Sequence, residues 1–155
     1  MTETETAAQF IRDFWRGAPF GFALVWTLED KRSQWVDVAR LSPSQSDGDN
    51  LAGSLAAIPA GRNTYLGMGL SYEDHGPKSR GKADTVAGIA GLWLDLDIAG
   101  PGHTKGNLPA STEEALALLG EAYPETAPTV VTHSGGGLQA FWLFTEPWMF
   151  GDAAD

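Results

Sequence analysis

The feature that most constrains the fold is the segment 91–98, which reads Gly-Leu-Trp-Leu-Asp-Leu-Asp-Ile. Side chains alternate between the two faces of a β-strand, so Trp93, Asp95 and Asp97 share one face of such a strand. The opposite face is wholly aliphatic and therefore belongs in a hydrophobic core. We expect a strand over 91–98 whose core-facing residues are Leu92, Leu94, Leu96 and Ile98.

Two carboxylates on one face of a strand are unusual in so apolar a setting. Asp95 and Asp97 would stand about 7 Å apart along the strand, which is twice the usual rise per residue. Their charges repel each other unless a cation compensates, and Mg²⁺ or Mn²⁺ takes carboxylate oxygens readily. Paired metals of this kind assist phosphoryl transfer. The alternative is that both acids simply face solvent.

A run of three glycines forms the second motif, with Ser134 before Gly135, Gly136 and Gly137. It lies between two predicted strands, 129–133 and 138–144. Consecutive backbone N–H groups in such a loop can bind an anion, and the Ser134 hydroxyl adds a donor, which suits a triphosphate. Gln139 follows on the next strand and could reach the same anion or a base. The alternative is an ordinary hairpin turn.

Other segments predict helices and strands in a mixed order, which favours an α+β fold with a mixed or antiparallel sheet. Residues 111–114, Ser-Thr-Glu-Glu, form a capping box that precedes a helix over 115–122. Further predictions are a helix over 6–16, strands over 20–28, 34–39 and 64–72, a short helix from Asp49 or Asn50 to Ile58, and loops over 73–85 and 100–107.

Composition excludes several classes of function. The net charge of −10 argues against nucleic-acid binding through a large basic surface. The absence of cysteine excludes disulfides and Cys-ligated zinc. No apolar run is long enough to span a membrane and the N-terminus does not resemble a signal peptide, so we expect a cytoplasmic protein.

Taken together, the motifs resemble the archaeo-eukaryotic primase superfamily, and in particular the prim-pol (DNA primase/polymerase) domains of phage and mobile-element replication proteins. Residues 92–98 and 132–142 carry the resemblance, which covers roughly residues 60 to 148. It implies that Asp95 and Asp97 are catalytic and bind Mg²⁺ or Mn²⁺. It also implies that Ser134, Gly135, Gly136 and Gly137 contact the phosphates of the incoming nucleotide.

The same resemblance implies an RRM-like catalytic core. We expect an N-terminal portion of about residues 1–60, followed by a metal- and nucleotide-binding portion of about 61–155. The expected partners are nucleoside triphosphates, a DNA template and primer, and a helicase domain or further C-terminal region. A homodimer through an exposed sheet edge is a further expectation.

Two departures from the family pattern predict weak or absent activity for this chain alone. Family members commonly carry histidine where this sequence has Gln139, and glutamine cannot carry a positive charge. The third acidic motif of the family lies on a later strand, for which Asp152 or Asp155 is a poor substitute. We therefore interpret the chain as a partial prim-pol domain, with a non-catalytic nucleotide- or nucleic-acid-binding replication module as the alternative.

Secondary candidates flank the acidic strand. Arg80 and Lys82 precede it in a polar loop and could contact nucleotide phosphate or template. His103 follows it in a glycine-rich loop as a candidate third metal ligand, although a surface histidine is the plainer interpretation. A third hypothesis is a metal phosphohydrolase with an aspartyl nucleophile, for which Lys105 is the only lysine after Asp97.

Overall fold

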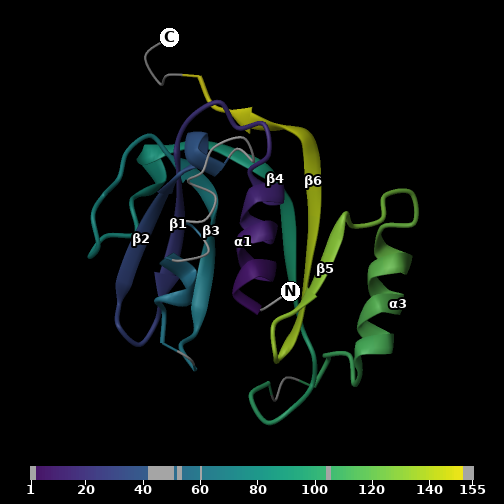
Figure 1. Cartoon of the computed structure of the whole chain (residues 1–155). Coiled ribbons are helices and arrows are strands. Elements are labelled where there is room, and N and C mark those ends of the chain that lie inside the picture. Colours follow the sequence, from purple (N-terminus) through teal and green to yellow (C-terminus); the bar gives the residue numbers. More distant parts are fainter. Residues whose placement is uncertain (1–2, 42–50, 52–53, 60, 104–105, 152–155) are drawn as a thin grey trace. The chain divides into compact units, whose positions relative to one another are not determined.

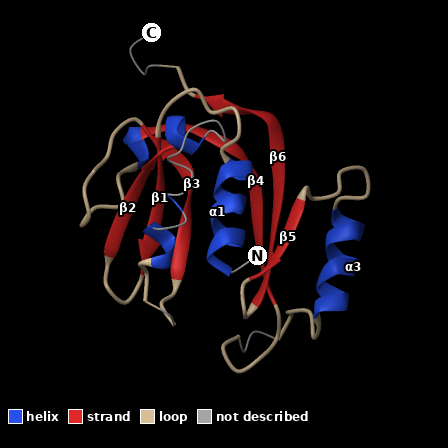
Figure 2. Ribbon diagram, in the orientation of Figure 1, coloured by secondary structure: helices blue, strands red, loops and turns tan. Residues whose placement is uncertain are grey.

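The computed structural model describes residues 3–41, 51, 54–59, 61–103 and 106–151 and has the α+β fold that the sequence predicted. The described strands form one six-stranded sheet in the order β2-β1-β3-β4-β6-β5 (Figure 2). The chain divides into two compact units, Met1–Ala90 with Thr145–Asp155 (unit 1) and Gly91–Phe144 (unit 2). By this division, the boundary expected near residue 60 falls inside unit 1.

Unit 1 is built on three antiparallel strands, with β1 (Phe22–Thr27) between β2 (Arg32–Asp37) and β3 (Thr64–Ser71), as Figure 1 shows. Helix α1 (Glu3–Phe14) precedes them and buries Ile11 and Phe14. Its amphipathic pattern therefore predicted the helix correctly. Unit 1 also contains two short 3₁₀ helices, η1 (Val38–Leu41) and η2 (Ala83–Thr85).

Strands β4 (Val86–Asp97) and β6 (Gly137–Met149) are longer than the sequence predicted and run through both units. The prediction that the acidic strand begins at residue 91 was wrong, because β4 begins at Val86 and includes Gly88 and Gly91, although glycines weaken a strand. Gly91 lies inside β4, close to the backbone of β6. A Cβ on Gly91 would collide with the carbonyl oxygen of Trp142, so this position within the strand requires glycine.

In unit 2, the helix α3 (Thr112–Ala122) packs on the sheet formed by β4, β5 (Val130–His133) and β6. Most of the predicted aliphatic face is confirmed, but Leu92 is 58% exposed. The core formed with α3 ends at Leu94, and Leu92 instead lines an open groove. The members of this core are Leu94, Leu96, Ile98, Ala115, Leu119, Leu138, Ala140 and Trp142.

The predicted cap of α3 is confirmed with one change. The Ser111 hydroxyl accepts a hydrogen bond from the Glu114 backbone N–H at 3.2 Å. The Glu114 carboxylate accepts from the N–H of Ala110, one residue before the expected partner, at 2.7 Å. Of the helix predicted up to Ile58, residues 51 and 54–56 are helical, and its cap at Asp49 or Asn50 lies outside the described residues. No described helix is both long and apolar enough to cross a membrane.

Candidate active site

The two aspartates of β4 lie on the polar face of unit 2. Leu94 and Leu96 enter the core below α3, so Asp95 and Asp97 point to the opposite side of the strand. Gln139 lies between the core residues Leu138 and Ala140 of β6 and by the same alternation faces the same way as the acids. The structure thus brings three of the predicted site residues to one face.

Sequence reasoning missed a fourth polar residue on this face. Thr132 of β5 is paired directly with Gln139 of β6, so their side chains share a side of the hairpin. Thr132 and Gln139 are both half-buried. The sequence could have predicted this pair, because a tight turn over residues 134–137 fixes the register of the two strands and places Thr132 opposite Gln139.

The imidazole of His103 lies beside the carboxylate of Asp97. Mutual hydrogen bonds between the backbones of Gly100 and His103, at 3.2 and 3.0 Å, close a tight turn just after β4. The turn brings the imidazole Nδ1 to 3.4 Å from Oδ2 of Asp97. Both side chains are a little over one-third exposed, so solvent and ligands can reach the pair.

Each glycine of the 134–137 turn has its own structural reason. Gly135 has a φ of +94°, a conformation that favours glycine. A Cβ on Gly136 would lie 2.8 Å from Nε2 of His103, and one on Gly137 would collide with the carbonyl oxygen of Leu96. The glycines therefore allow β4 and the His103 turn to approach the hairpin closely.

The turn is a tight hairpin, and its own structure uses part of the anion-binding capacity that the sequence suggested. The backbone N–H of Ser134 donates to the carbonyl of Gly137 at 3.0 Å, so this N–H cannot also bind an anion. The Ser134 side chain is exposed, so its hydroxyl can reach a ligand. The N–H of Ile98, next to Asp97, donates to the carbonyl of Gly136 at 3.0 Å. The acidic strand and the glycine turn are therefore direct neighbours.

The two aspartates are better suited to a metal ion that binds together with a phosphate ligand than to a metal ion held by protein ligands alone. Among the residues the structure describes, no group of three or more His, Cys, Asp or Glu side chains is placed to hold a metal ion. Mg²⁺ usually binds proteins through one or two carboxylates and completes its shell with water and substrate phosphates. Asp95 and Asp97 supply that number of carboxylates on an accessible face. Lys105 lies outside the described residues.

Arg80 and Lys82 belong to unit 1, whereas the aspartates, His103 and the glycine turn belong to unit 2. The Arg80 guanidinium carbon lies 4.6 Å from the centre of the Trp26 ring on β1. The Lys82 backbone N–H donates to the Thr85 hydroxyl at 3.2 Å, at the start of η2. Trp26 was not singled out from the sequence, because nothing in the chain order signals its contact with Arg80.

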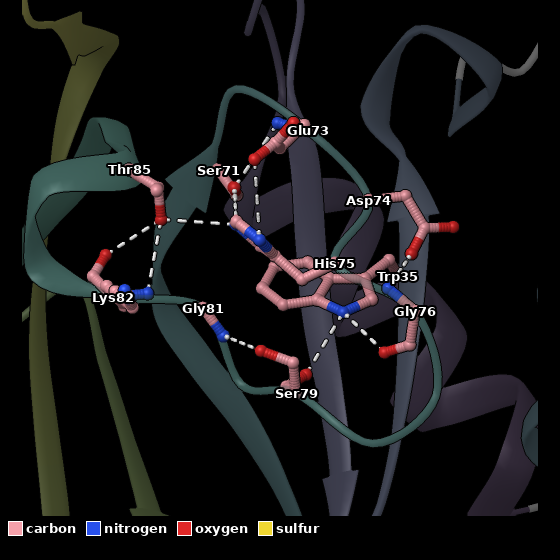
Figure 3. A network of polar contacts seen from close by, with 10 residues as sticks. All are labelled: Trp35, Ser71, Glu73, Asp74, His75, Gly76, Ser79, Gly81, Lys82 and Thr85. Atoms are coloured by element: carbon pink, nitrogen blue, oxygen red, sulfur yellow. Dashed lines mark hydrogen bonds and ion pairs between the residues drawn. The ribbon is translucent and has the colours of Figure 1, made fainter.

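His75, also missed from the sequence, is the centre of a polar network in the same loop (Figure 3). Its Nε2 lies 2.9 Å from the Ser71 hydroxyl and 3.1 Å from the Thr85 hydroxyl, and Nδ1 lies 3.6 Å from a Glu73 carboxylate oxygen. The set resembles a Ser-His-carboxylate catalytic triad in composition. However, Ser71 is only 4% exposed and also accepts from the Glu73 N–H, so the network ties the two ends of the loop together.

Comparisons with known proteins leave the family open. No protein-family model matches this chain, and neither the curated proteins nor the solved structures include a significant match.

Proposed function

We propose that this chain is a metal-dependent nucleotidyltransferase module of the primase/polymerase kind, with the acidic face of unit 2 as its active site. The observation that carries the proposal is the adjacency of Asp97, His103 and the glycine turn. The imidazole of His103 contacts the Asp97 carboxylate with one nitrogen and lies against Gly136 with the other. The prim-pol resemblance of residues 92–98 and 132–142 involves these same two segments.

In this proposal each side chain has a distinct role. Asp95 and Asp97 would hold Mg²⁺ or Mn²⁺, and the bound ion would supply Lewis-acid chemistry for phosphoryl transfer. The exposed Ser134 hydroxyl and backbone N–H groups of the turn contact the triphosphate. Gln139 lies on the same face of the sheet as the aspartates, and its side-chain amide donates a hydrogen bond to the nucleotide. His103 orients the Asp97 carboxylate.

Slow turnover is part of the proposal. Gln139 is neutral where a histidine could carry charge, so it stabilises a triphosphate less strongly. We therefore expect weak primer extension by the chain alone, and rapid Asp95-dependent synthesis would contradict this part.

The alternative is a replication module that binds nucleotide without turnover. Its support is the tight hairpin at residues 134–137, because Gly137 is required for close packing against the Leu96 backbone whether or not phosphate binds. The two functions differ in their need for metal. Nucleotide affinity that is the same in Mn²⁺ and in EDTA would favour the non-catalytic module.

The decisive experiment is calorimetric titration of a deoxynucleoside triphosphate into the protein with Mn²⁺. We expect the double variant Asp95→Asn with Asp97→Asn to bind at least about ten-fold more weakly, since each removed charge contact to a metal is worth more than about 1.4 kcal/mol. The matched control is Asp84→Asn, an exposed acid in η2 of unit 1 that should leave affinity unchanged. Equal affinity for the double variant and the wild type would refute the proposed site.

Self-association deserves its own measurement, because β5 ends the strand order of the sheet and pairs with β6 alone among the described strands. An edge strand of this kind can pair with a second copy. Sedimentation of the chain across a concentration series tests the proposed homodimer, and a monomer at all concentrations would exclude it.

A further inference from the structure

A pair of aromatic rings lies on one face of unit 1, outside the acidic site. Trp26 of β1 and Tyr65 of β3 are directly paired across the two strands, and their ring centres are 5.5 Å apart. Tyr65 is 50% exposed and Trp26 is half-buried, so the rings leave apolar surface open to solvent. Cross-strand aromatic pairs also stabilise a sheet, which is the plain structural explanation for this pair.

Arg80 makes this surface more than a sheet-stabilising pair. Its guanidinium lies over the Trp26 ring, and no carboxylate in the described part of the chain forms an ion pair with it. By contrast, Arg40 and Arg62 pair with Asp37 and Asp30. A guanidinium held by an aromatic face keeps its N–H donors available for a phosphate.

The loop over residues 72–85 fixes Arg80 in position. Trp35 donates its indole N–H to the carbonyls of Gly76 and Ser79, at 3.2 and 3.3 Å, and His75 joins Ser71 to Thr85 (Figure 3). The loop thus presents its cations from a prearranged backbone. A ligand that binds there loses less affinity to ordering of the loop.

A groove of about 300 Å³ runs under the same loop. Arg80 and Lys82 lie along its wall, and Trp35 and Leu24 form apolar parts of the lining. Gly67 and Gly69 of β3 contribute no side chains to the groove. The volume is at the lower end for small-molecule sites and suits a single base with its sugar.

We propose that Trp26, Tyr65 and Arg80 form a binding platform for single-stranded nucleic acid, with Lys82 as a second phosphate contact. Exposed aromatic rings stack on any base, and the adjacent cations bind the backbone, so the site needs no particular sequence. The net charge of −10 excludes affinity from bulk basic surface, which leaves stacking as the main source of binding energy. This platform requires no metal and does not depend on the proposed nucleotidyl transfer.

The test measures anisotropy of a fluorescent twelve-nucleotide oligothymidylate at low salt in EDTA, using the full chain. The Asp95→Asn, Asp97→Asn variant is measured in parallel and should bind like the wild type, so failure of the acidic site does not affect this result. Tyr65→Leu should weaken binding about five- to a hundred-fold, the range for loss of one stacking partner. Tyr65→Phe should bind the oligonucleotide as tightly as the wild type, which would show that binding depends on the aromatic ring and not on the hydroxyl.

Arg80 has an independent readout. Arg80→Gln should lower the slope of log affinity against log salt by about 0.7, the value for one phosphate contact on a single strand. The matched controls are Arg40→Gln, an exposed arginine paired with Asp37, and Tyr123→Leu, an exposed tyrosine in contact with Trp142 of unit 2. Both controls should bind like the wild type, and a parallel oligouridylate titration establishes whether the strand is DNA or RNA.

Several outcomes would overturn the platform. Wild-type protein that does not bind either oligonucleotide would do so, as would a folded Tyr65→Leu variant with unchanged affinity. An equal loss in Tyr123→Leu would show that binding follows general aromatic exposure. A dimer that Tyr65→Leu converts to a monomer, without oligonucleotide binding, would instead assign this face to a second copy of the chain.

Discussion

The two loops that carry the candidate functional residues are held in place by different kinds of contact, side-chain contacts in one and backbone contacts in the other. In unit 1, side chains hold the loop over residues 72–85, chiefly the indole of Trp35 and the imidazole of His75. In unit 2, backbone contacts that require glycine hold the turn over residues 134–137 against β4. A loop held by side chains tolerates changes in its backbone, whereas a turn held by close backbone approach tolerates almost no added atom.

The largest effect is expected from breaking the backbone contact in unit 2. A Cβ at Gly137 meets the Leu96 carbonyl and lies 3.0 Å from the Asp97 Cα, and backbone atoms cannot move aside as a side chain can. Gly137→Ala should therefore lower the free energy of unfolding by about 3 kcal/mol, the upper part of the range for overpacking. Urea unfolding measures this change. Gly102→Ala, with open space around its Cβ, is the control and should change stability by less than about 0.5 kcal/mol.

A smaller effect is expected from breaking the side-chain contact in unit 1. Trp35→Phe removes the one indole N–H that the carbonyls of Gly76 and Ser79 share, which should cost about 1 kcal/mol. The loop should open locally, and trypsin should cleave faster after Arg80 and Lys82. Trp148→Phe, at a residue 63% exposed, is the control. Unchanged cleavage in Trp35→Phe would show that other contacts hold the loop.

The cap of α3 extends the comparison, because in this part of unit 2 a side chain, that of Ser111, forms a hydrogen bond with the backbone. Ser111→Ala should cost about 1 kcal/mol of stability by removing the acceptor of the Glu114 N–H. Ser111→Asp should restore most of it. The Ser111 hydroxyl also helps to lower the pKa of Glu113, after the larger contribution of that residue's own backbone N–H. A carboxyl titration by NMR should show the Glu113 pKa closer to 4.5 in Ser111→Ala.

The smallest expected effect concerns the acid response of unit 1. The pKa of Glu29 is lowered from 4.5 because its carboxylate accepts from its own backbone N–H and then from the Asn63 backbone and side-chain amides. A carboxylate with a lowered pKa in the folded state stabilises above pH 4.5, and its contribution is lost as the pH falls through the lowered value. Glu29→Gln should therefore reduce the decline of stability below pH 4.5. The same decline in the variant and the wild type would contradict this.

The sequence predicted the backbone-determined part of the site well, for a physical reason. Alternation along a strand and the turn chemistry of glycine are local, so residues 94–98 and the hairpin at 134–137 followed from the sequence. The prediction that Leu92 is buried in the core was wrong, because its burial depends on where α3 ends, which is not a local property of the sequence. The contacts of Trp35 with Gly76 and of Arg80 with Trp26 join positions far apart in the chain, and no periodic pattern in the sequence predicts them. The contacts of His75 with Ser71 and Thr85 are closer in the chain, but they too follow no periodic pattern.

The hydrogen bond from the Ile98 N–H to the Gly136 carbonyl gives the acidic site a built-in reporter. Its proton exchanges with solvent only when the glycine turn separates from the end of β4. A ligand that bridges the turn and the aspartates would slow deuterium uptake at this single amide, and a ligand bound elsewhere would leave it unchanged. Occupancy of the candidate site is therefore readable at one backbone position, whether or not the proposed turnover takes place.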